Sequence, residues 1–352
     1  MAMTQSSSTD LSSLSNDHDD ELVATASSWC ASHGVLMGRS SQDYVYEPAP
    51  FSLHPSPFPR SAFEKSYRLG KPFNRIVHAI ADQYQDWLRP TIRVAAEGDE
   101  EFTGKLMKLA DSVVDTKRVQ NVALGLLRSD YMLHQDTHGD INTDPYPLQV
   151  ELNTIASSFA CLSSKISKLH QFLDRQHTHT ENNDLPDNPA ATNIADGLAA
   201  ALHQYVRQSS AMMTTTQSTP TQQSFQPVIL MIVQPGETNS CDQRDLEFLL
   251  HKRHGLRMIR RSLHDIATTG TYNAENDSVF QGKELVLPEQ QGGKSTMVTA
   301  AVVYFRAGYT PNDYPSQVEW EGRAFIEHSA AIKCPDVFYH LVGTKVSRNR
   351  IE

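Results

Sequence analysis

The segment from Val228 to Val233, VILMIV, constrains the fold more than any other part of the chain. A continuous apolar run of this kind is typical of a parallel strand that is covered on both faces. A helix is predicted from about Cys241 to His254, ending at Gly255, because glycine suits the residue that follows a helix. Leu256 to Arg260 can form the next strand. Strand, helix and strand in such a short stretch predict a βαβ unit.

Two further elements extend this unit. Val298 to Phe305 is predicted to be a strand and Gln317 to about Ile332 a helix. Residues 227–340 are therefore expected to form a small parallel α/β domain. Gly293-Lys294-Ser295 resembles the end of a phosphate-binding loop, but Pro288 stands where that motif needs glycine. We expect a hairpin loop between Leu287 and Met297 instead.

The region before this domain has its own periodic patterns. Seven apolar residues from Phe73 to Leu88 have helical spacing, and Arg89-Pro90 is expected to end that helix, because proline disfavours α geometry in the residue before it. Phe102 to Val114 predicts a second amphipathic helix. Val122 to Leu127 predicts a buried strand, and Leu148 to Thr154 predicts a strand with two different faces.

Low-complexity segments divide the rest of the chain. Residues 1–20 are polar and acidic and are expected to be disordered. Residues 176–188 and 213–223 lack periodicity and are expected to be disordered insertions. The predicted organisation is a tail over 1–20, an N-terminal lobe over 21–226, an α/β substrate-binding domain over 227–340, and a last segment over 341–352.

Composition excludes several classes of function. The 31 Lys and Arg residues face 41 Asp and Glu residues, and a net charge of −10 makes a nucleic-acid partner unfavourable. No apolar run reaches the roughly 18 residues that a membrane span needs. The N-terminus lacks the features of a signal or transit peptide. Four cysteines far apart in sequence indicate reduced thiols, so a cytoplasmic protein is expected.

The segment from Leu148 to Ser158 carries a candidate cation site. Side chains alternate along a strand, which predicts that Gln149, Glu151 and Asn153 share one face. A carboxylate and a carboxamide oxygen on one face suit Mg²⁺ bound together with nucleotide phosphates. The alternative is an ordinary half-exposed strand with polar residues toward water.

Three other positions have both a functional and an ordinary interpretation. Arg128 could clamp a carboxylate with two parallel hydrogen bonds, or pair with Asp130 at the surface. Arg306 ends a strand in the same way, and there the alternative is a plain strand end. Glu237, Asn239 and Gln243 follow a predicted strand, where ligands commonly bind, but Gln243 could instead close a capping box with Ser240.

Taken together, these segments resemble the eukaryotic glutathione synthetase family from about Leu22 to Lys345. Several motifs occur in the order of the family. They are YEPAPFSLHPSPFPRSAFEKSY, GLLRSDYM, VELNTIASSF, DQR, MIRRSLHDI, VVYFRAGYTPNDY and KCPDVFYHLVGTK. The resemblance implies an α/β fold of the ATP-grasp class, incomplete in this chain, with the small parallel α/β domain inserted.

The resemblance also implies roles for individual residues. Glu151 corresponds to an acid that binds Mg²⁺ and approaches ATP, Asn153 to a second Mg²⁺ ligand, and Lys345 to a lysine that contacts ATP. The implied substrate-binding residues are Arg128, Ile155, Ala156, Ser157, Ser158, Glu237, Thr238, Asn239, Gln243, Arg306, Ala307, Gly308 and Tyr309. Thr238 stands where animal enzymes commonly have arginine, and Ala307 replaces an acidic residue often found there, so the side-chain roles at both positions are open.

The implied reaction joins glycine to γ-glutamylcysteine at the expense of ATP. The cysteinyl carboxylate attacks the γ-phosphate to give an acyl phosphate, and the amine of glycine then displaces phosphate, while the protein positions the reactants and neutralises charge. The implied partners are ATP, γ-glutamylcysteine and glycine, with Mg²⁺ as the metal and a homodimer as the full-length assembly. A non-catalytic protein or subunit that only binds γ-glutamylcysteine is the alternative.

The family continues well beyond the GTK motif, whereas this chain ends VSRNRIE. We expect from this that the chain is truncated, that it lacks the acid, the glycine-rich lid and the basic residues which complete the ATP site, and that it is inactive alone. Val346-Ser347 after Lys345 also matches what a splice donor read into an intron would encode.

Overall fold

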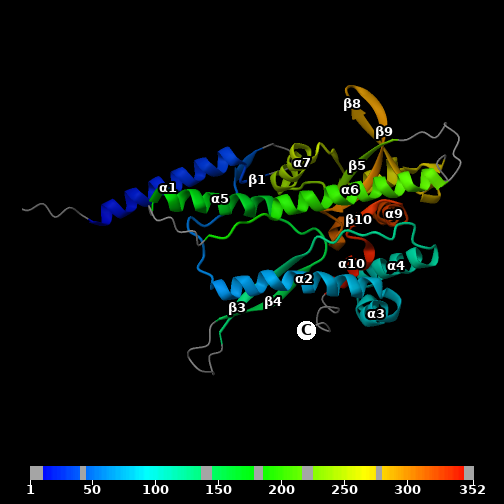
Figure 1. Ribbon diagram of the computed structural model, residues 1–352, viewed down its shortest axis with the longest axis horizontal. Helices are drawn as coiled ribbons and strands as arrows, with labels where there is room; N and C mark the ends of the chain where they lie inside the picture. Colours follow the sequence, from blue (N-terminus) through cyan, green and yellow to red (C-terminus); the bar gives the residue numbers. More distant parts are fainter. Residues whose placement is uncertain are drawn as a thin grey trace, which may run out of the picture. The chain divides into compact units, whose positions relative to one another are not determined.

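The computed structural model describes residues 11–39, 45–135, 145–177, 185–215, 225–274 and 280–344. Its helices and strands are labelled in Figure 1. The chain divides into two compact units. Unit 1 comprises Met1–Pro57, Phe159–Ala191 and Gly236–Asp245; unit 2 comprises Phe58–Ser158, Thr192–Pro235 and Leu246–Glu352. Among the helices of the described ranges, none is long and apolar enough to cross a bilayer.

Unit 1 is built on two helices that share one apolar cluster. Helix α1, Leu11–His33, contributes Leu22, Ala26 and Cys30, and helix α5, Ala160–His177, contributes Leu162, Leu169 and Leu173. Strands β1, Leu36–Gly38, and β2, Tyr46–Pro48, form a small antiparallel pair. The unit also holds the first residues of helix α7, Ser240–His254.

Helix α1 starts inside the tail that was expected to be disordered up to residue 20. Residues 11–20 are helical because they continue a helix whose later turns are buried, and extending a helix is far easier than nucleating one. Residues 1–10 lie outside the described part of the chain.

Unit 2 contains a mixed sheet rather than a purely parallel one. The strand order is β6-β5-β9-β8-β7. β8 pairs with the first half of β9, along residues 294–299, and β10 pairs with its last part, along residues 302–304. β5, β6, β9 and β10 are parallel, whereas β8 and β7 run antiparallel to their neighbours. The strands are β5 Gln226–Ile232, β6 Met258–Arg261, β7 Thr271–Tyr272, β8 Leu285–Gln291, β9 Lys294–Phe305 and β10 Ile332–Cys334.

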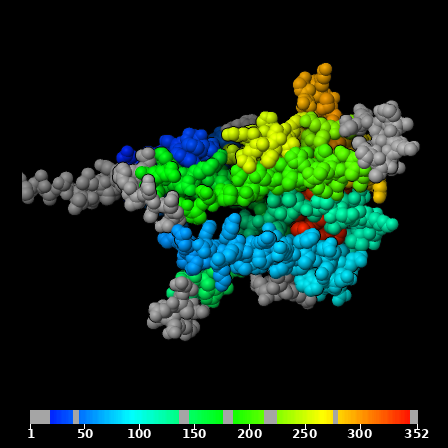
Figure 2. All heavy atoms as spheres, in the orientation of Figure 1, coloured from blue at the N-terminus to red at the C-terminus, as the bar shows by residue number. Residues whose placement is uncertain are grey.

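The βαβ unit and the hairpin are confirmed. β5, α7 and β6 follow one another as expected, and α7 is followed by Gly255 in the left-handed region, with a φ of +65°. The exposed tip of the β8–β9 hairpin contains Gly293-Lys294-Ser295 and stands out from the surface in orange (Figure 2).

The helices of unit 2 come from both halves of the sequence. They are α2 Arg60–Asp82, α3 Arg89–Gly98, α4 Lys105–Asp115, most of α6 Ala190–Thr215, most of α7, α8 Leu263–Thr269, α9 Gln317–Glu327 and α10 Val337–Val342. π-helical turns over Tyr84–Leu88 and Glu100–Gly104 connect α2 to α3 and α3 to α4.

One apolar core joins the early helices to the sheet. Val77, Leu88 and Leu106 belong to the same buried cluster as Leu230 of β5 and Phe305 of β9. The boundary predicted at 226/227 is therefore not a boundary between units, because the segments on either side of it bury their apolar faces against each other.

Several local predictions need correction. Pro90 does not end the helical path, because it occupies the first turn of α3, where proline's missing N–H is tolerated. Residues 122–127 form no continuous strand: they are half-buried, and Ala123 makes a single parallel bridge to Lys333 of β10.

Helices extend into both segments that were expected to be disordered insertions. α5 runs to His177 and α6 to Thr215, so both helices enter the segments 176–188 and 213–223. Residues 178–184 and 216–224 lie outside the described part of the chain.

Candidate functional site

The central element of the site is an antiparallel hairpin in unit 2, which packs along α2 (Figure 1). It consists of β3, Arg128–His134, and β4, Tyr146–Asn153. The register pairs Arg128 with Asn153, Ser129 with Leu152, and Asp130 with Glu151. Residues directly opposite each other in a sheet share a face, so one face carries four polar side chains while Leu152 is buried on the other.

A β-bulge changes the predicted pattern at Gln149. The register shifts between Asp130 and Tyr131, so that Tyr131 pairs with Gln149 and Val150 is the extra residue. Gln149 accordingly donates to Ser129 Oγ at 2.5 Å, on the face of Leu152. Glu151 and Asn153 share a face as expected, but Gln149 does not, because the bulge resets the alternation between them.

Asp130 lies at the centre of the polar face. Arg128 donates from Nε to Oδ1 and from Nη2 to Oδ2 of Asp130, both at 2.9 Å. Asn153 Nδ2 donates to the same Oδ2 at 3.4 Å. The surface pairing that was the ordinary alternative for Arg128 is therefore present, and it occurs within the polar face.

The loop after β4 has a strained backbone. Ala156 adopts a φ of +52°, a left-handed conformation that is unfavourable for a residue with a Cβ atom. Ser157 Oγ donates to the Leu126 carbonyl at 3.4 Å, and Ser158 Oγ donates to the Ala156 carbonyl at 3.1 Å. The half-buried loop from Ile155 to Ser158 thus directly follows Asn153 of the polar face.

The second group of predicted residues lies in unit 1. The Glu237 carboxylate accepts from the backbone N–H of Asn239 at 2.6 Å and from Nε2 of Gln243 at 2.9 Å. Asn239 and Gln243 are buried, and the Thr238 carbonyl accepts from the N–H of Gly38 at 2.8 Å. These bonds make Glu237 the acceptor that organises the turn before α7.

Asp242, within the DQR motif, has a structural role that the sequence did not reveal. Its buried carboxylate accepts from the backbone N–H groups of Phe159, Cys161 and Leu162, at 3.0, 2.9 and 3.2 Å. These N–H groups stand at the start of α5 and have no partner within that helix. Asp242 therefore fixes the start of α5 from a different part of the chain.

The third group surrounds a pocket of about 590 Å³ in unit 2. The pocket lies beyond the carboxyl ends of β5, β6 and β9, the position where parallel α/β sheets commonly bind ligands. Ala307 and Tyr309 line it, whereas the predicted Arg306 is buried and Gly308 turns the chain with a φ of +92°. The other lining residues are Val233, Gln234, Pro235, Ser262, Leu263, His264, Thr310, Asn312, Asp313, Pro315 and Glu319.

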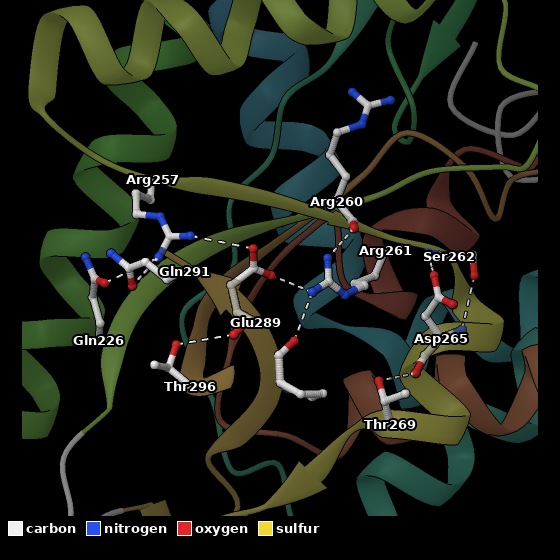
Figure 3. Close-up of polar contacts among 11 residues, drawn as sticks. Gln226, Arg257, Arg260, Arg261, Ser262, Asp265, Thr269, Glu289, Gln291 and Thr296 are labelled. Atoms are coloured by element: carbon white, nitrogen blue, oxygen red, sulfur yellow. Dashed lines mark hydrogen bonds and ion pairs between the residues drawn. The ribbon is translucent and has the colours of Figure 1, made fainter. Parts of the chain in front are cut away.

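The strand–helix junction beside this pocket is held by ion pairs and a helix cap (Figure 3). The Glu289 carboxylate of β8 lies between two arginines, 2.5 Å from Nη2 of Arg261 and 3.6 Å from Nη2 of Arg257. The Arg260 side chain points away from Glu289. Ser262 and Asp265 form a reciprocal capping box at the start of α8. These contacts fix Ser262 at the rim of the pocket.

Glu319 is the pocket acid with a shifted pKa. Burial raises its pKa, but hydrogen bonds from Ser316 and an interaction with His264, 3.4 Å away, outweigh burial and lower it. Glu319 is therefore held in its charged form in the wall of the pocket.

Comparison with known proteins identifies the family. The model for the eukaryotic glutathione synthase ATP-binding domain matches residues 16–345. The chain belongs to the eukaryotic glutathione synthases. Among similar proteins, glutathione synthetase of Dictyostelium discoideum is 36% identical over 304 residues, 84% of this chain and 56% of that protein.

Other relatives of the glutathione synthase family agree. Chloroplastic glutathione synthetase of Arabidopsis thaliana is 33% identical over 96% of this chain and 57% of its own length. Glutathione synthetase of Macaca fascicularis is 33% identical over 93% of this chain and 61% of its own length. The chain thus spans less than two thirds of these relatives. In fold it is similar to a glutathione synthetase-like effector of Globodera pallida in its apo form, with a TM-score of 0.64, 20% identity, and coverage of 94% of this chain and 64% of that one.

The predicted residues occupy three parts of the chain, two in unit 2 and one in unit 1. Arg128, Glu151 and Asn153 share the hairpin face, Ala307 and Tyr309 line the pocket, and the residues from 237 to 243 lie in unit 1. Lys345 lies outside the described residues. Sequence reasoning treated Asp130 only as a surface partner and missed Ser262, His264 and Glu319. Asp130 follows Arg128 by two residues, and this spacing could have predicted that the two side chains share a strand face.

Proposed function

We propose that this chain contributes to an ATP- and Mg²⁺-dependent ligase that joins glycine to γ-glutamylcysteine. Membership of the glutathione synthase family supports the reaction class. The polar face of the β3–β4 hairpin is the observation that carries the proposal, because it places a guanidinium, two carboxylates and a carboxamide together.

The hairpin face fits a magnesium ion. Asp130 and Glu151 stand directly opposite each other, and two like charges in that position favour a bound cation. Glu151 would hold the ion with its carboxylate and Asn153 with its carboxamide oxygen, and oxygen ligands are those that Mg²⁺ prefers. When bound, the ion supplies charge neutralisation for the phosphates of ATP.

Arg128 can bind a substrate carboxylate without releasing Asp130. Asp130 uses the edge formed by Nε and Nη2, whereas the edge formed by Nη1 and Nη2 can make two parallel bonds to a second carboxylate. The loop from Ile155 to Ser158 adds hydroxyl groups next to this face. We assign Arg128 and this loop to γ-glutamylcysteine.

The family resemblance assigns substrate contacts to two other groups, each within its own unit. Glu237, Asn239 and Gln243 supply a carboxylate and two amides in unit 1, and Ala307 and Tyr309 line the pocket beyond the sheet in unit 2.

The direct test is turnover and binding by the purified protein. In the ligase to which this chain contributes, we expect glutathione and phosphate to form only when ATP, Mg²⁺, γ-glutamylcysteine and glycine are all present, and EDTA to stop the reaction. Calorimetry separates the non-catalytic alternative, which predicts binding of the dipeptide without binding of the nucleotide. Absence of dipeptide binding would overturn both.

A first variant tests the metal assignment. Glu151→Gln keeps the size of the side chain but removes its charge, so we expect the Mg²⁺ concentration for half-maximal ATP binding to rise about tenfold or more. Glu97→Gln, at an exposed position of α3, is the matched control and should leave that concentration unchanged. Equal metal dependence in the two variants would contradict the assignment.

Two further properties are proposed: a homodimeric assembly, from the family resemblance, and a cytoplasmic location, from the four cysteines that lie far apart in the sequence. Analytical ultracentrifugation tests the first. Microscopy of the tagged native protein tests the second, with a chloroplast as the competing outcome because two relatives are named chloroplastic.

A further inference from the structure

We propose that Asp130 is the positioning residue of the hairpin site, orienting both the substrate clamp Arg128 and the metal ligand Asn153. The inference rests on the proposed function. It adds a group that touches neither substrate nor metal but determines how the groups that do so are held.

The first argument is the geometry of the Arg128 pair. Both oxygens of Asp130 accept from one edge of the guanidinium at 2.9 Å, which fixes the plane of a side chain that is 41% exposed. An arginine at this exposure would otherwise sample many rotamers, and ordering it on binding would weaken affinity. Asp130 therefore orders the guanidinium before the substrate arrives.

The second argument is the orientation of Asn153. Its Nδ2 faces Oδ2 of Asp130 at 3.4 Å, so the carboxamide oxygen is turned away from Asp130 and is the end that remains to hold a cation. Asn153 follows Glu151 by two positions in the strand, on the same face. One carboxylate thus selects the orientation of an amide that could otherwise present either end.

The third argument is electrostatic. Asp130 stands directly opposite Glu151, where two like charges destabilise a sheet unless a cation lies close by. Arg128 supplies one cation, and the remaining negative potential favours a divalent ion beside Glu151.

The experiment compares Asp130→Asn with Asp196→Asn in the intact protein. Asp196 accepts three bonds from Arg253 in a pair of similar exposure and also lies 2.7 Å from His254 Nε2, so it is a control ion pair outside the site. We expect Asp130→Asn to raise both the Kd for γ-glutamylcysteine and the Mg²⁺ concentration for half-saturation by about tenfold, because a charge-assisted pair and an oriented ligand are lost. Asp196→Asn should change neither.

A double variant separates positioning from a direct role. In an Arg128→Met background, Asp130→Asn should have no further effect on dipeptide affinity, but it should still shift the Mg²⁺ requirement. Additive losses in dipeptide affinity would overturn the inference, as would a shift in melting temperature without a shift in either binding constant. If the wild-type protein fails to bind γ-glutamylcysteine at all, the proposed function fails first, and this is distinguishable from failure of Asp130 alone.

Discussion

Arg128 has two tasks that one lysine side chain could not perform at the same time. Its guanidinium pairs with Asp130 along one edge and offers a second edge of the same planar group to a substrate. A lysine ammonium keeps the charge but loses both the plane and the parallel pair of donors. The identity of this residue, and not only its charge, therefore matters for the site.

The prediction at this position is that Arg128→Lys weakens γ-glutamylcysteine binding by about ten- to a hundredfold, because a bidentate charge-assisted contact becomes a single one. Titration calorimetry measures the affinity. Arg253→Lys, in the pair with Asp196, is the control and should leave it unchanged. Full affinity in Arg128→Lys would show that the clamp is elsewhere.

The residues of this face were partly predictable. Alternation along β4 correctly placed Glu151 and Asn153 together, because the strand is regular between them. Gln149 was misplaced since a bulge leaves no mark in the sequence pattern. The Asp242 cap of α5 was equally invisible, because it joins residues about eighty positions apart.

Among the elements, helices α8 and α9 make an unusually close crossing. A Cβ atom on Gly322 of α9 would lie 2.1 Å from the Leu263 carbonyl oxygen of α8, which is backbone and cannot move aside cheaply. Ser262, Leu263 and His264 at the start of α8, and Glu319 of α9, line the pocket. The width of this crossing therefore determines the shape of the pocket wall.

We predict that Gly322→Ala lowers the free energy of unfolding by about 2–3 kcal/mol, because the helices must separate and their packing is disrupted. Gly197→Ala in α6 is the matched control: its Cβ atom would meet only ordinary contacts, the nearest at 3.7 Å. There the better helix propensity of alanine should stabilise by roughly 0.5–1 kcal/mol. Urea unfolding measures both, and equal effects would contradict the crossing argument.

Periodicity identified most of the elements but not their ends. It gave the β5–α7–β6 unit because an apolar run and a glycine stop are local signals. It failed at Pro90, where a π-helical turn brings the chain into a new helix without a break. It failed again at residues 122–127, where an apolar run makes only one bridge to a strand far along the sequence.

Across the whole molecule, the division into units follows contacts rather than sequence order. Helix α7 belongs to unit 1 by its first residues and to unit 2 by the rest. Each unit collects three separate stretches of chain, so the composition shift near residue 226 could not locate a boundary.

The core of unit 2 also buries charged and titratable groups that tie stability to pH. Arg323 is fully buried, with its Nε donating to Glu327 at 2.9 Å and its guanidinium 4.0 Å from the centre of the Phe305 ring. His340 of α10 is buried, and its ring lies edge-on to Phe102. Burial, together with the positive charge of Arg323, holds the pKa of His340 well below its usual value.

The sign of this effect follows from proton binding. Below the unfolded pKa of roughly 6.5 the unfolded chain takes up a proton at His340 and the folded chain does not, so stability falls as the pH drops. The pKa of His328 is also lowered, by burial and then by Lys333 and Lys283, and it acts in the same direction. Burial raises the pKa of Asp336, which acts in the opposite direction at lower pH.

We therefore predict that the free energy of unfolding decreases between pH 6.5 and 5.5, and that His340→Gln reduces this slope by up to about 1.4 kcal/mol per pH unit. Urea unfolding at a series of pH values measures the slope. His328→Gln should remove a separate part of it, and the double variant should be flatter than either single one, because the two histidines titrate at different places in the core. If His340→Gln keeps the wild-type slope, the buried imidazole is not what couples this core to pH.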